Sequence, residues 1–238
     1  MKISLKKLTL LLALLISGST FAQLEILIGR SQPIGGFAKK SGFEQAGYGK
    51  QGTCFQMNAM SEVGEFKMTL SAYGGLNKFN IDAYKPQFIE ANKANGKAYT
   101  RFEVGKYGNF GLNFGPEYII QVTDKIIVPI RAHVGFHIMM PPLKFKAYYT
   151  DQYSIYDSGE SYDECSGSFV YEVLGLNFKL GTGIGYRLGD NYLLLRADYS
   201  NRFAGFGQMS YGSGDARATY PKKFTSLDFN IGFAFGLD

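Results

Sequence analysis

An alternation of apolar and polar residues recurs in eight segments of the 238-residue chain and constrains the fold more than any other feature. The clearest segment runs from Leu227 to Phe235, where every second side chain is large and apolar. Successive side chains of a β-strand point to opposite faces, so this period predicts strands with one apolar and one polar face. The predicted strands are residues 24–28, 55–59, 66–72, 110–120, 126–136, 174–186, 193–199 and 227–235.

The two faces of these strands differ sharply in chemistry. No position on the apolar face is charged, whereas the other face is rich in glycine. The polar face carries four negative and four positive side chains: Glu25, Glu117, Asp198, Asp228, Lys67, Arg131, Lys179 and Arg196. A soluble barrel turns its apolar face inward, whereas a membrane barrel turns it outward to lipid. Large apolar residues on all eight strands, with aromatic residues near the strand ends, favour the membrane arrangement.

The links between the predicted strands alternate in length. Residues 61–65, 121–125 and 189–191 are short turns, whereas the long loops cover about 30–51, 74–109, 139–168 and 204–223. This alternation predicts an all-β, eight-stranded, antiparallel up-and-down transmembrane β-barrel with both chain ends on the short-turn side. Pro116 and Pro129 lie inside strands, where each removes a donor from the ladder, so we expect a bulge or an open pair at each.

Residues 1–22 have the pattern of a secretory signal peptide. Three lysines precede an apolar stretch over residues 8–16, and small residues lead to a cleavage site after Ala22. Removing this segment leaves 22 of the 25 basic residues against 20 acidic residues, so the remaining chain is nearly neutral. We therefore do not expect nucleic acid as a partner.

The signal peptide, strand number, loop asymmetry and aromatic-rich last strand resemble those of small outer-membrane barrels of the OmpA/OmpX type. The Gly-rich and Tyr-rich composition is similar to that of PorT-like outer-membrane β-barrel-domain proteins. The resemblance covers residues 23–238 and implies one barrel domain in the outer membrane of a Gram-negative bacterium. It implies the lipid bilayer and the barrel-insertion machinery as partners. One departure is that residues 236–238 follow Phe235, whereas such barrels typically end on an aromatic residue.

The predicted lumen has room for little beyond its own side chains, because an eight-stranded barrel is just wide enough for them to fill. The eight inward charges should then form a neutral, salt-bridged plug, since an unpaired buried charge is costly. These features predict an integral outer-membrane protein that is not an enzyme and displays long surface loops for structural or binding roles. A small gated channel is an alternative.

Two further functions stay open from the sequence. His133 and His137 are predicted to face inward on one strand, and four residues along a strand span roughly 13 Å, too far to bind one metal ion directly. An outer-membrane hydrolase using His137 is one alternative, although no spacing selects a nucleophile or an orienting acid. A soluble secreted ligand-binding barrel is the other. We expect no catalytic residue, metal or cofactor.

Cys54 and Cys165 are the only two cysteines, and both are expected at the outer rim. Export to an oxidising compartment permits a disulfide between them, and two free thiols are equally consistent with the sequence.

The second long loop is basic, and the third is acidic and rich in tyrosine. The two loops could pack on each other over the barrel mouth, or they could bind a glycan, a lipopolysaccharide phosphate or a partner protein. Tyrosine supplies contact area at low entropic cost, which suits binding. The candidate binding residues are Tyr148, Tyr149, Tyr153, Tyr156 and Tyr162.

Overall fold

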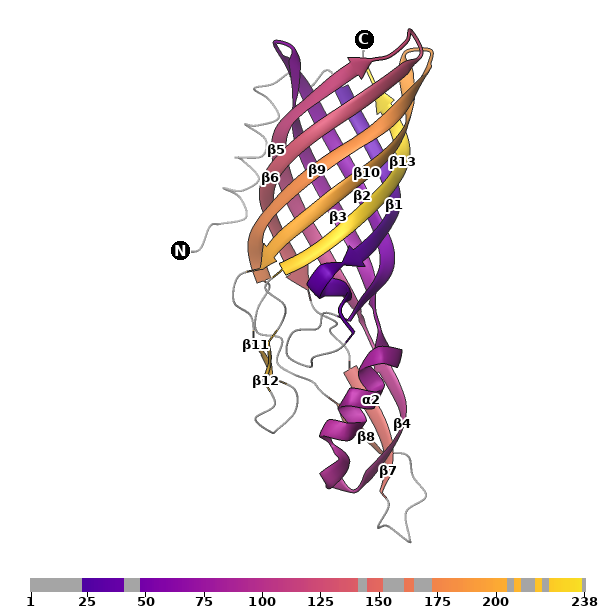
Figure 1. Ribbon diagram of the computed structural model, residues 1–238, viewed down its shortest axis with the longest axis vertical. Coiled ribbons are helices and arrows are strands. Elements are labelled where there is room, and N and C mark those ends of the chain that lie inside the picture. The colour runs from indigo at the N-terminus through magenta and orange to yellow at the C-terminus, as the bar shows by residue number, and fades with distance from the viewer. Residues whose placement is uncertain are drawn as a thin grey trace, which may run out of the picture.

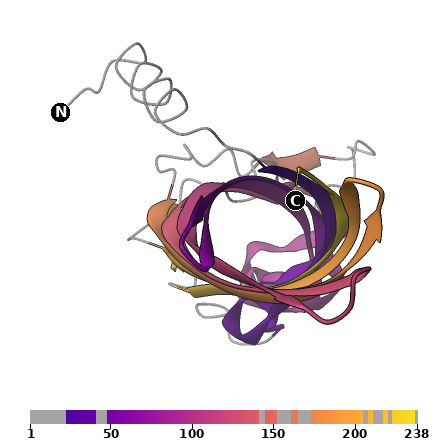
Figure 2. The ribbon, with the colours of Figure 1, turned by 90° about the horizontal axis from the view of Figure 1, so that it is seen from above.

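Eight long antiparallel strands form one closed barrel in the computed structural model, which describes residues 23–40, 48–140, 145–151, 161–164, 173–204, 208–210, 217–219 and 223–236. The strands are β1 (Gln23–Ile34), β2 (Gly49–Val63), β3 (Phe66–Phe79), β5 (Lys106–Gln121), β6 (Ile126–Met140), β9 (Val173–Leu188), β10 (Asn191–Ala204) and β13 (Lys223–Phe235). Each pairs with the next barrel strand along the chain, and β1 closes the ring on β13 (Figures 1 and 2). The predicted up-and-down topology is confirmed. The predicted signal peptide, residues 1–22, lies outside the described residues.

All eight predicted strands are present, and several extend further toward the long loops than predicted. β3 continues to Phe79, and its ladder with β5 still pairs Lys78 with Lys106. The apolar alternation fades there, whereas the hydrogen-bonded ladder continues, because backbone pairing does not depend on side-chain hydrophobicity.

The ladders open at the two strand prolines. The ladder between β5 and β6 skips two positions at Pro116, and the ladder between β6 and β9 skips two positions at Pro129. The register on either side is unchanged in both cases. The prolines therefore produce the open pairs that the sequence predicts, and the strands need no bulge to accommodate them.

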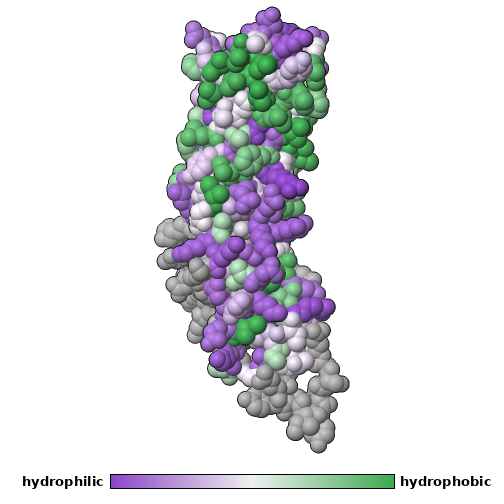
Figure 3. All heavy atoms as spheres, turned by 45° about the vertical axis from the view of Figure 1, so that its right-hand side comes forward, coloured by the Kyte–Doolittle hydropathy of each residue, from purple (hydrophilic) through white to green (hydrophobic). Residues whose placement is uncertain are grey.

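The apolar face of the barrel points outward. Ile28, Val134 and Leu176 are 65%, 61% and 60% exposed, whereas Glu117 and Asp198 on the opposite face are buried. On the face drawn in Figure 3, apolar side chains gather on the short-turn half of the barrel and polar side chains toward the long loops. The predicted orientation of the two faces is confirmed, and the inverse orientation of a soluble ligand-binding barrel is contradicted.

A small subdomain extends the barrel at its long-loop end (Figure 1). It contains α2 (Ile81–Ala91), η2 (Lys93–Asn95) and a three-stranded sheet of β4 (Lys97–Val104), β7 (Phe145–Asp151) and β8 (Ser161–Glu164). Because β4 belongs to the second long loop and β7 and β8 to the third, this sheet joins the two loops. A short hairpin of β11 (Gln208–Ser210) and β12 (Arg217–Thr219) lies in the fourth long loop.

Within the described ranges, no helix has both the length and the apolar character needed to cross a bilayer.

Candidate functional site

The centre of the lumen is held by pairs between arginines and carboxylates. Arg131 donates to both carboxylate oxygens of Asp198, from Nε at 2.9 Å and from Nη2 at 2.6 Å. Both side chains are fully buried. Two parallel charge-assisted hydrogen bonds fix the planar guanidinium against the planar carboxylate, the arrangement in which such a pair binds most strongly.

A second arginine bridges two carboxylates in the same layer. Arg196 Nη2 lies 2.6 Å from Glu25 Oε2 and 2.6 Å from Glu117 Oε1. Arg131 Nη1 lies 3.8 Å from Glu25 Oε1, which links this cluster to the first pair. Five of the eight predicted lumen charges therefore belong to one network, which spans β1, β5, β6 and β10.

Of the other three predicted lumen charges, Asp228 and Lys179 are also buried in the lumen, whereas Lys67 is only partly buried. Asp228 pairs with Arg202 at 3.3 Å, and Lys179 donates to Gln56 at 2.9 Å. Lys67 lies near the short-turn rim with part of its side chain exposed, and donates to Gln23 at 2.6 Å. The buried set is thus Glu25, Glu117, Asp198, Asp228, Arg131, Lys179, Arg196 and Arg202, with equal numbers of each sign.

Arg202 was not predicted to face the lumen, because the apolar alternation that marks the seventh strand ends at residue 199. Its alternation with Arg196 and Asp198, at even positions of β10, was the signal that could have found it.

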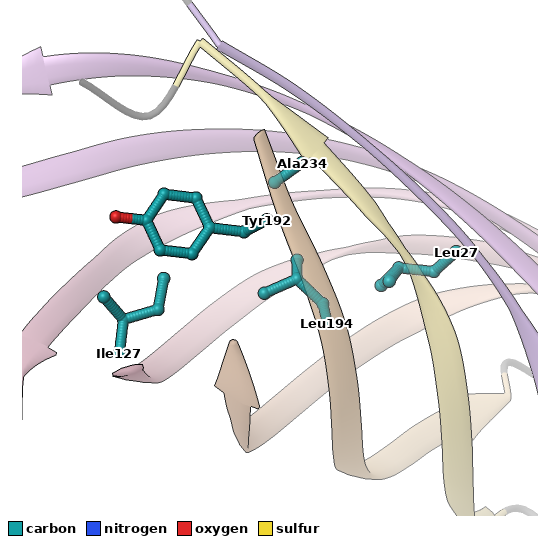
Figure 4. Close-up of a cluster of buried hydrophobic side chains, with 5 residues drawn as sticks. All are labelled: Leu27, Ile127, Tyr192, Leu194 and Ala234. Carbon is teal, nitrogen blue, oxygen red and sulfur yellow. The ribbon is translucent and has the colours of Figure 1, made fainter. Parts of the chain in front are cut away.

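Apolar side chains fill the lumen near the short turns, where a polar lining was predicted. Leu27, Ile127, Tyr192, Leu194 and Ala234 form a buried cluster there (Figure 4). These residues alternate along their strands with apolar residues that face outward, as Leu194 does with Leu193 and Leu195. Hydrophobicity alone therefore could not identify which of the apolar residues face the lumen, and the strand register decides it.

An aromatic stopper fills the opposite end of the lumen. Phe37, in the short 3-10 helix η1 (Gly35–Ala38), is fully buried. Its ring centroid lies 5.2 Å from those of Tyr107 and Phe224, both edge-on. A Cβ at Gly49 would come within 2.8 Å of the Phe37 ring. Glycine at this position therefore leaves the space in which the Phe37 ring packs.

Both histidines face the lumen and are buried. Neither His133 nor His137 makes a hydrogen bond to a hydroxyl or carboxylate of a described residue, so no nucleophile–base pair is assembled at either within that part of the chain. No group of three His, Cys, Asp or Glu side chains in the described ranges could hold a metal ion.

Cys54 does not lie at the outer rim. It lies well inside β2, and its thiol donates to Asn230 Oδ1 in the lumen at 3.2 Å. The placement at the rim was wrong because β2 begins at Gly49, earlier than the apolar alternation indicated. Cys54 is a free cysteine in this structure, and Cys165 lies outside the described residues.

The tyrosines of the third loop contribute to the sheet of the subdomain. Tyr148 and Tyr149 lie in β7, with the Arg101 guanidinium 3.9 Å from the first ring and the Lys97 ammonium 4.1 Å from the second. These cation–π contacts join the basic second loop to the tyrosine-rich third loop. Tyr162 lies in β8, whereas Tyr153 and Tyr156 lie outside the described residues.

An aromatic core joins the subdomain to the long-loop end of the barrel, where Tyr48 and Phe79 contribute to it. Tyr84 and Phe88 lie one helical turn apart on α2, and the Tyr84 ring packs edge-on against Tyr48 and Phe79, at 5.2 and 5.3 Å. The Phe88 ring lies 5.1 Å from Tyr99 and 5.5 Å from Phe102, both edge-on. This core fixes α2 on β4, so the subdomain presents a preformed surface.

A surface ion pair connects α2 to the barrel wall. Lys50 Nζ lies 2.6 Å from Asp82 Oδ2, in the first turn of the helix. The hydrogen bond and the positive charge of Lys50 lower the pKa of the exposed Asp82 carboxyl below its ordinary value of 3.8.

The barrel thus combines an outward apolar face, a filled interior, short turns at one end and long loops at the other. This is the architecture of an eight-stranded outer-membrane-type barrel.

Comparisons with known proteins gave structural similarities only. No protein-family model matches the chain, and no curated protein matches it. Neisserial surface protein A is similar at 8% identity, with 90% of this chain and 96% of that chain covered and a TM-score of 0.46. A major outer membrane protein from Thermus thermophilus is similar at 14% identity, with 89% and 98% covered and a TM-score of 0.42. Ail, the attachment invasion locus protein of Yersinia pestis, is similar at 10% identity, with 90% and 98% covered and a TM-score of 0.37. The PorT-like resemblance stays a prediction.

Proposed function

We propose that this chain is an integral outer-membrane protein of a Gram-negative bacterium, with a plugged lumen and a folded subdomain displayed at the cell surface. Its role is structural or binding, and it has no catalytic step. The observation that carries the proposal is the orientation of the barrel wall, because large apolar side chains face outward while eight charged side chains are buried inside. Water would not stabilise this arrangement, whereas a hydrocarbon environment does.

Strand length and aromatic placement support insertion into a bilayer. The barrel strands have 12 to 16 residues, and a tilted spanning strand needs only about 9–11. Phe66 and Tyr118 pack at the short-turn edge of the outer wall, with ring centroids 5.6 Å apart. Aromatic rings at this level suit the interface between hydrocarbon and headgroups.

The filled lumen supports a structural role over transport. The short-turn end is closed by apolar residues, the centre by the ionic network and the long-loop end by Phe37. A solute would have to displace paired buried charges, whose separation is costly. The gated-channel alternative therefore has no support from the lumen.

The displayed subdomain supports the binding role. We propose that its tyrosine–cation sheet, with Tyr148 and Tyr149, contacts a glycan, lipopolysaccharide or protein ligand outside the cell, and that the barrel-insertion machinery assembles the chain. A rigid aromatic surface binds at a lower entropic cost than a mobile loop.

Membrane extraction and permeability test the proposal together. The protein should partition with outer membranes, need detergent for extraction and show faster gel mobility before heating than after. Vesicles containing it should swell in sugar solutions no faster than protein-free vesicles. A water-soluble monomer would overturn the membrane assignment, and rapid swelling would overturn the plugged lumen.

A further inference from the structure

A basic groove of about 230 Å³ lies on the outer wall of the barrel, next to the long loops. Arg30, Lys78 and Lys106 line it from β1, β3 and β5, and all three are exposed. Gln51, Gly52, Thr53 and Leu76 complete its lining. None of these residues belongs to the lumen network or to the subdomain.

The groove lies where the apolar outer wall ends. On β1 the outward series is Leu24, Ile26, Ile28 and then Arg30, and on β3 it ends with Leu76 and then Lys78. These positions alternate along a strand and therefore share one face of it. The cations are consequently at the level of the lipid headgroups once the apolar wall is embedded.

Among the described residues, the cations of the groove have no carboxylate partner within ion-pair distance. Lys78 and Lys106 are direct cross-strand partners, and like charges in this arrangement repel each other. Lys50 is the cross-strand partner of Lys78 on its other side, but Asp82 neutralises it. An anion between Arg30, Lys78 and Lys106 would relieve the repulsion.

An aromatic platform lies beside the groove on the apolar side. Phe55 and Phe110 close over Gly74, where an added Cβ would collide with the first ring and come within 2.9 Å of the second. Both rings are exposed. Glycine at this position lets both rings lie close to the β3 backbone, one outward position along the strand from Leu76 of the groove.

We propose that this groove binds the phosphate group of a phosphorylated glycolipid of the outer leaflet, of the lipid A type. Arg30 engages two phosphate oxygens through its planar fork, while Lys78 and Lys106 supply point charges and Thr53 and Gln51 supply neutral donors. The acyl chains lie along the platform of Phe55 and Phe110. The adjoining apolar wall selects a lipid over free phosphate, because only the lipid has acyl chains that can pack against it.

The inference rests on the proposed membrane insertion and deepens it by naming a lipid class. Wild type is reconstituted into phosphatidylcholine nanodiscs that contain lipid A, dephosphorylated lipid A or neither, and bound lipid is counted by native mass spectrometry. A fourth arm adds inorganic phosphate to the lipid-A-free discs. Wild type should retain lipid A and should retain neither the dephosphorylated lipid nor inorganic phosphate.

The test variant combines Arg30→Gln, Lys78→Gln and Lys106→Gln. Its affinity for lipid A should fall roughly a hundredfold, since each cation near an anionic surface contributes about a factor of five. The matched control, with Lys39→Gln, Lys93→Gln and Lys125→Gln, makes the same change in net charge at exposed positions outside the groove. It should bind lipid A as wild type does.

Three results would overturn the inference: equal retention of dephosphorylated lipid A, equal loss of binding in both triple variants, or saturable binding of inorganic phosphate alone. Heat-dependent gel mobility reports insertion in every sample. If wild type fails to insert, the proposed function is wrong; if it inserts without selecting lipid A, only the groove assignment is wrong.

Discussion

Arg131 and Asp198 show how this barrel accommodates charge in its interior. Each would be strongly destabilising alone, because removal from water costs several kcal/mol per ion. The pair offsets that cost with two hydrogen bonds in a fixed geometry, and Asn230 donates a further one to Asp198 at 3.3 Å. The contribution of each side chain to the stability of the barrel thus depends on the presence of the other.

Removing one partner should therefore cost more than removing both. Asp198→Ala should lower the free energy of unfolding by about 3–5 kcal/mol, because it leaves the Arg131 guanidinium buried without its partner. The double variant Asp198→Ala with Arg131→Met should recover part of this loss. Urea unfolding in vesicles, followed by gel mobility, measures the difference. A double variant less stable than Asp198→Ala would argue against mutual compensation.

The pair of Lys50 and Asp82 predicts a pH dependence at the junction of barrel and subdomain. The pKa of Asp82 is lowered in the folded protein, so its contribution is fully present above 3.8 and is lost as the pH falls through the lower folded value. Acidification below pH 3.8 should therefore weaken the attachment of α2. Hydrogen exchange of α2 amides, corrected for the intrinsic rate, should show a pH-dependent rise that Asp82→Asn abolishes. Equal pH dependence in both proteins would contradict this linkage.

At the scale of elements, the subdomain is a structure shared by two loops. β4 and β7 pair over the register from Lys97 with Asp151 to Val104 with Phe145, with one irregularity between Tyr99 and Arg101. Two loops that are already paired with each other lose less conformational entropy when they bind a ligand than two unpaired, mobile loops would lose. The arrangement gives a preformed surface without adding strands to the barrel.

Phe88→Ala tests whether the subdomain and the barrel are separable in stability. Deletion of this buried ring should cost the subdomain about 3–5 kcal/mol and make the second and third loops sensitive to protease. The barrel should keep its heat-dependent mobility, because the Phe88 ring packs on Tyr99 and Phe102 of the subdomain's own sheet. Glu90→Ala, at an exposed position of the same helix, is the control and should stay resistant. Loss of the barrel mobility shift in Phe88→Ala would show that the two parts fold as one unit.

At the scale of the whole molecule, the distribution of side chains is the reverse of that in a soluble protein, with apolar side chains on the outside and charged side chains inside. The outer wall is apolar and suited to lipid, while the interior charges are solvated by one another. Closure of the ring leaves no strand edge, which hydrocarbon would not tolerate. The same wall carries both the apolar region and the basic groove at its boundary.

A cation in the middle of the outer wall should impair assembly. Val134, near the centre of β6 and flanked across the strands by Phe114 and Phe178, is 61% exposed. Val134→Arg should destabilise the inserted barrel by about 2–4 kcal/mol, because the charge would lie near the bilayer midplane. Gln32→Arg, outward on β1 beyond Arg30, should assemble normally. Folding into vesicles followed by gel mobility compares the two, and normal assembly of Val134→Arg would refute the assignment of this face to lipid.

Part of the lumen could be predicted from residue types and part could not. The inward orientation of Glu25, Glu117, Arg131 and Asp198 follows from their alternation with apolar residues within clear strands. Lys67 and Arg202 were misjudged because the depth of a residue in the barrel depends on strand ends and on the stagger between strands. Cys54 was misplaced for the same reason.

The sequence by itself determined the number of barrel strands, their order, the separation of an apolar from a polar face and the outward orientation of the apolar face, because these follow from local periodicity, loop length and the size of the apolar residues. Only the tertiary structure decided which charges pair, where Phe37 packs and that two loops share one sheet. Those features depend on ring closure and on contacts between residues far apart in the chain, and a local pattern carries no information about either.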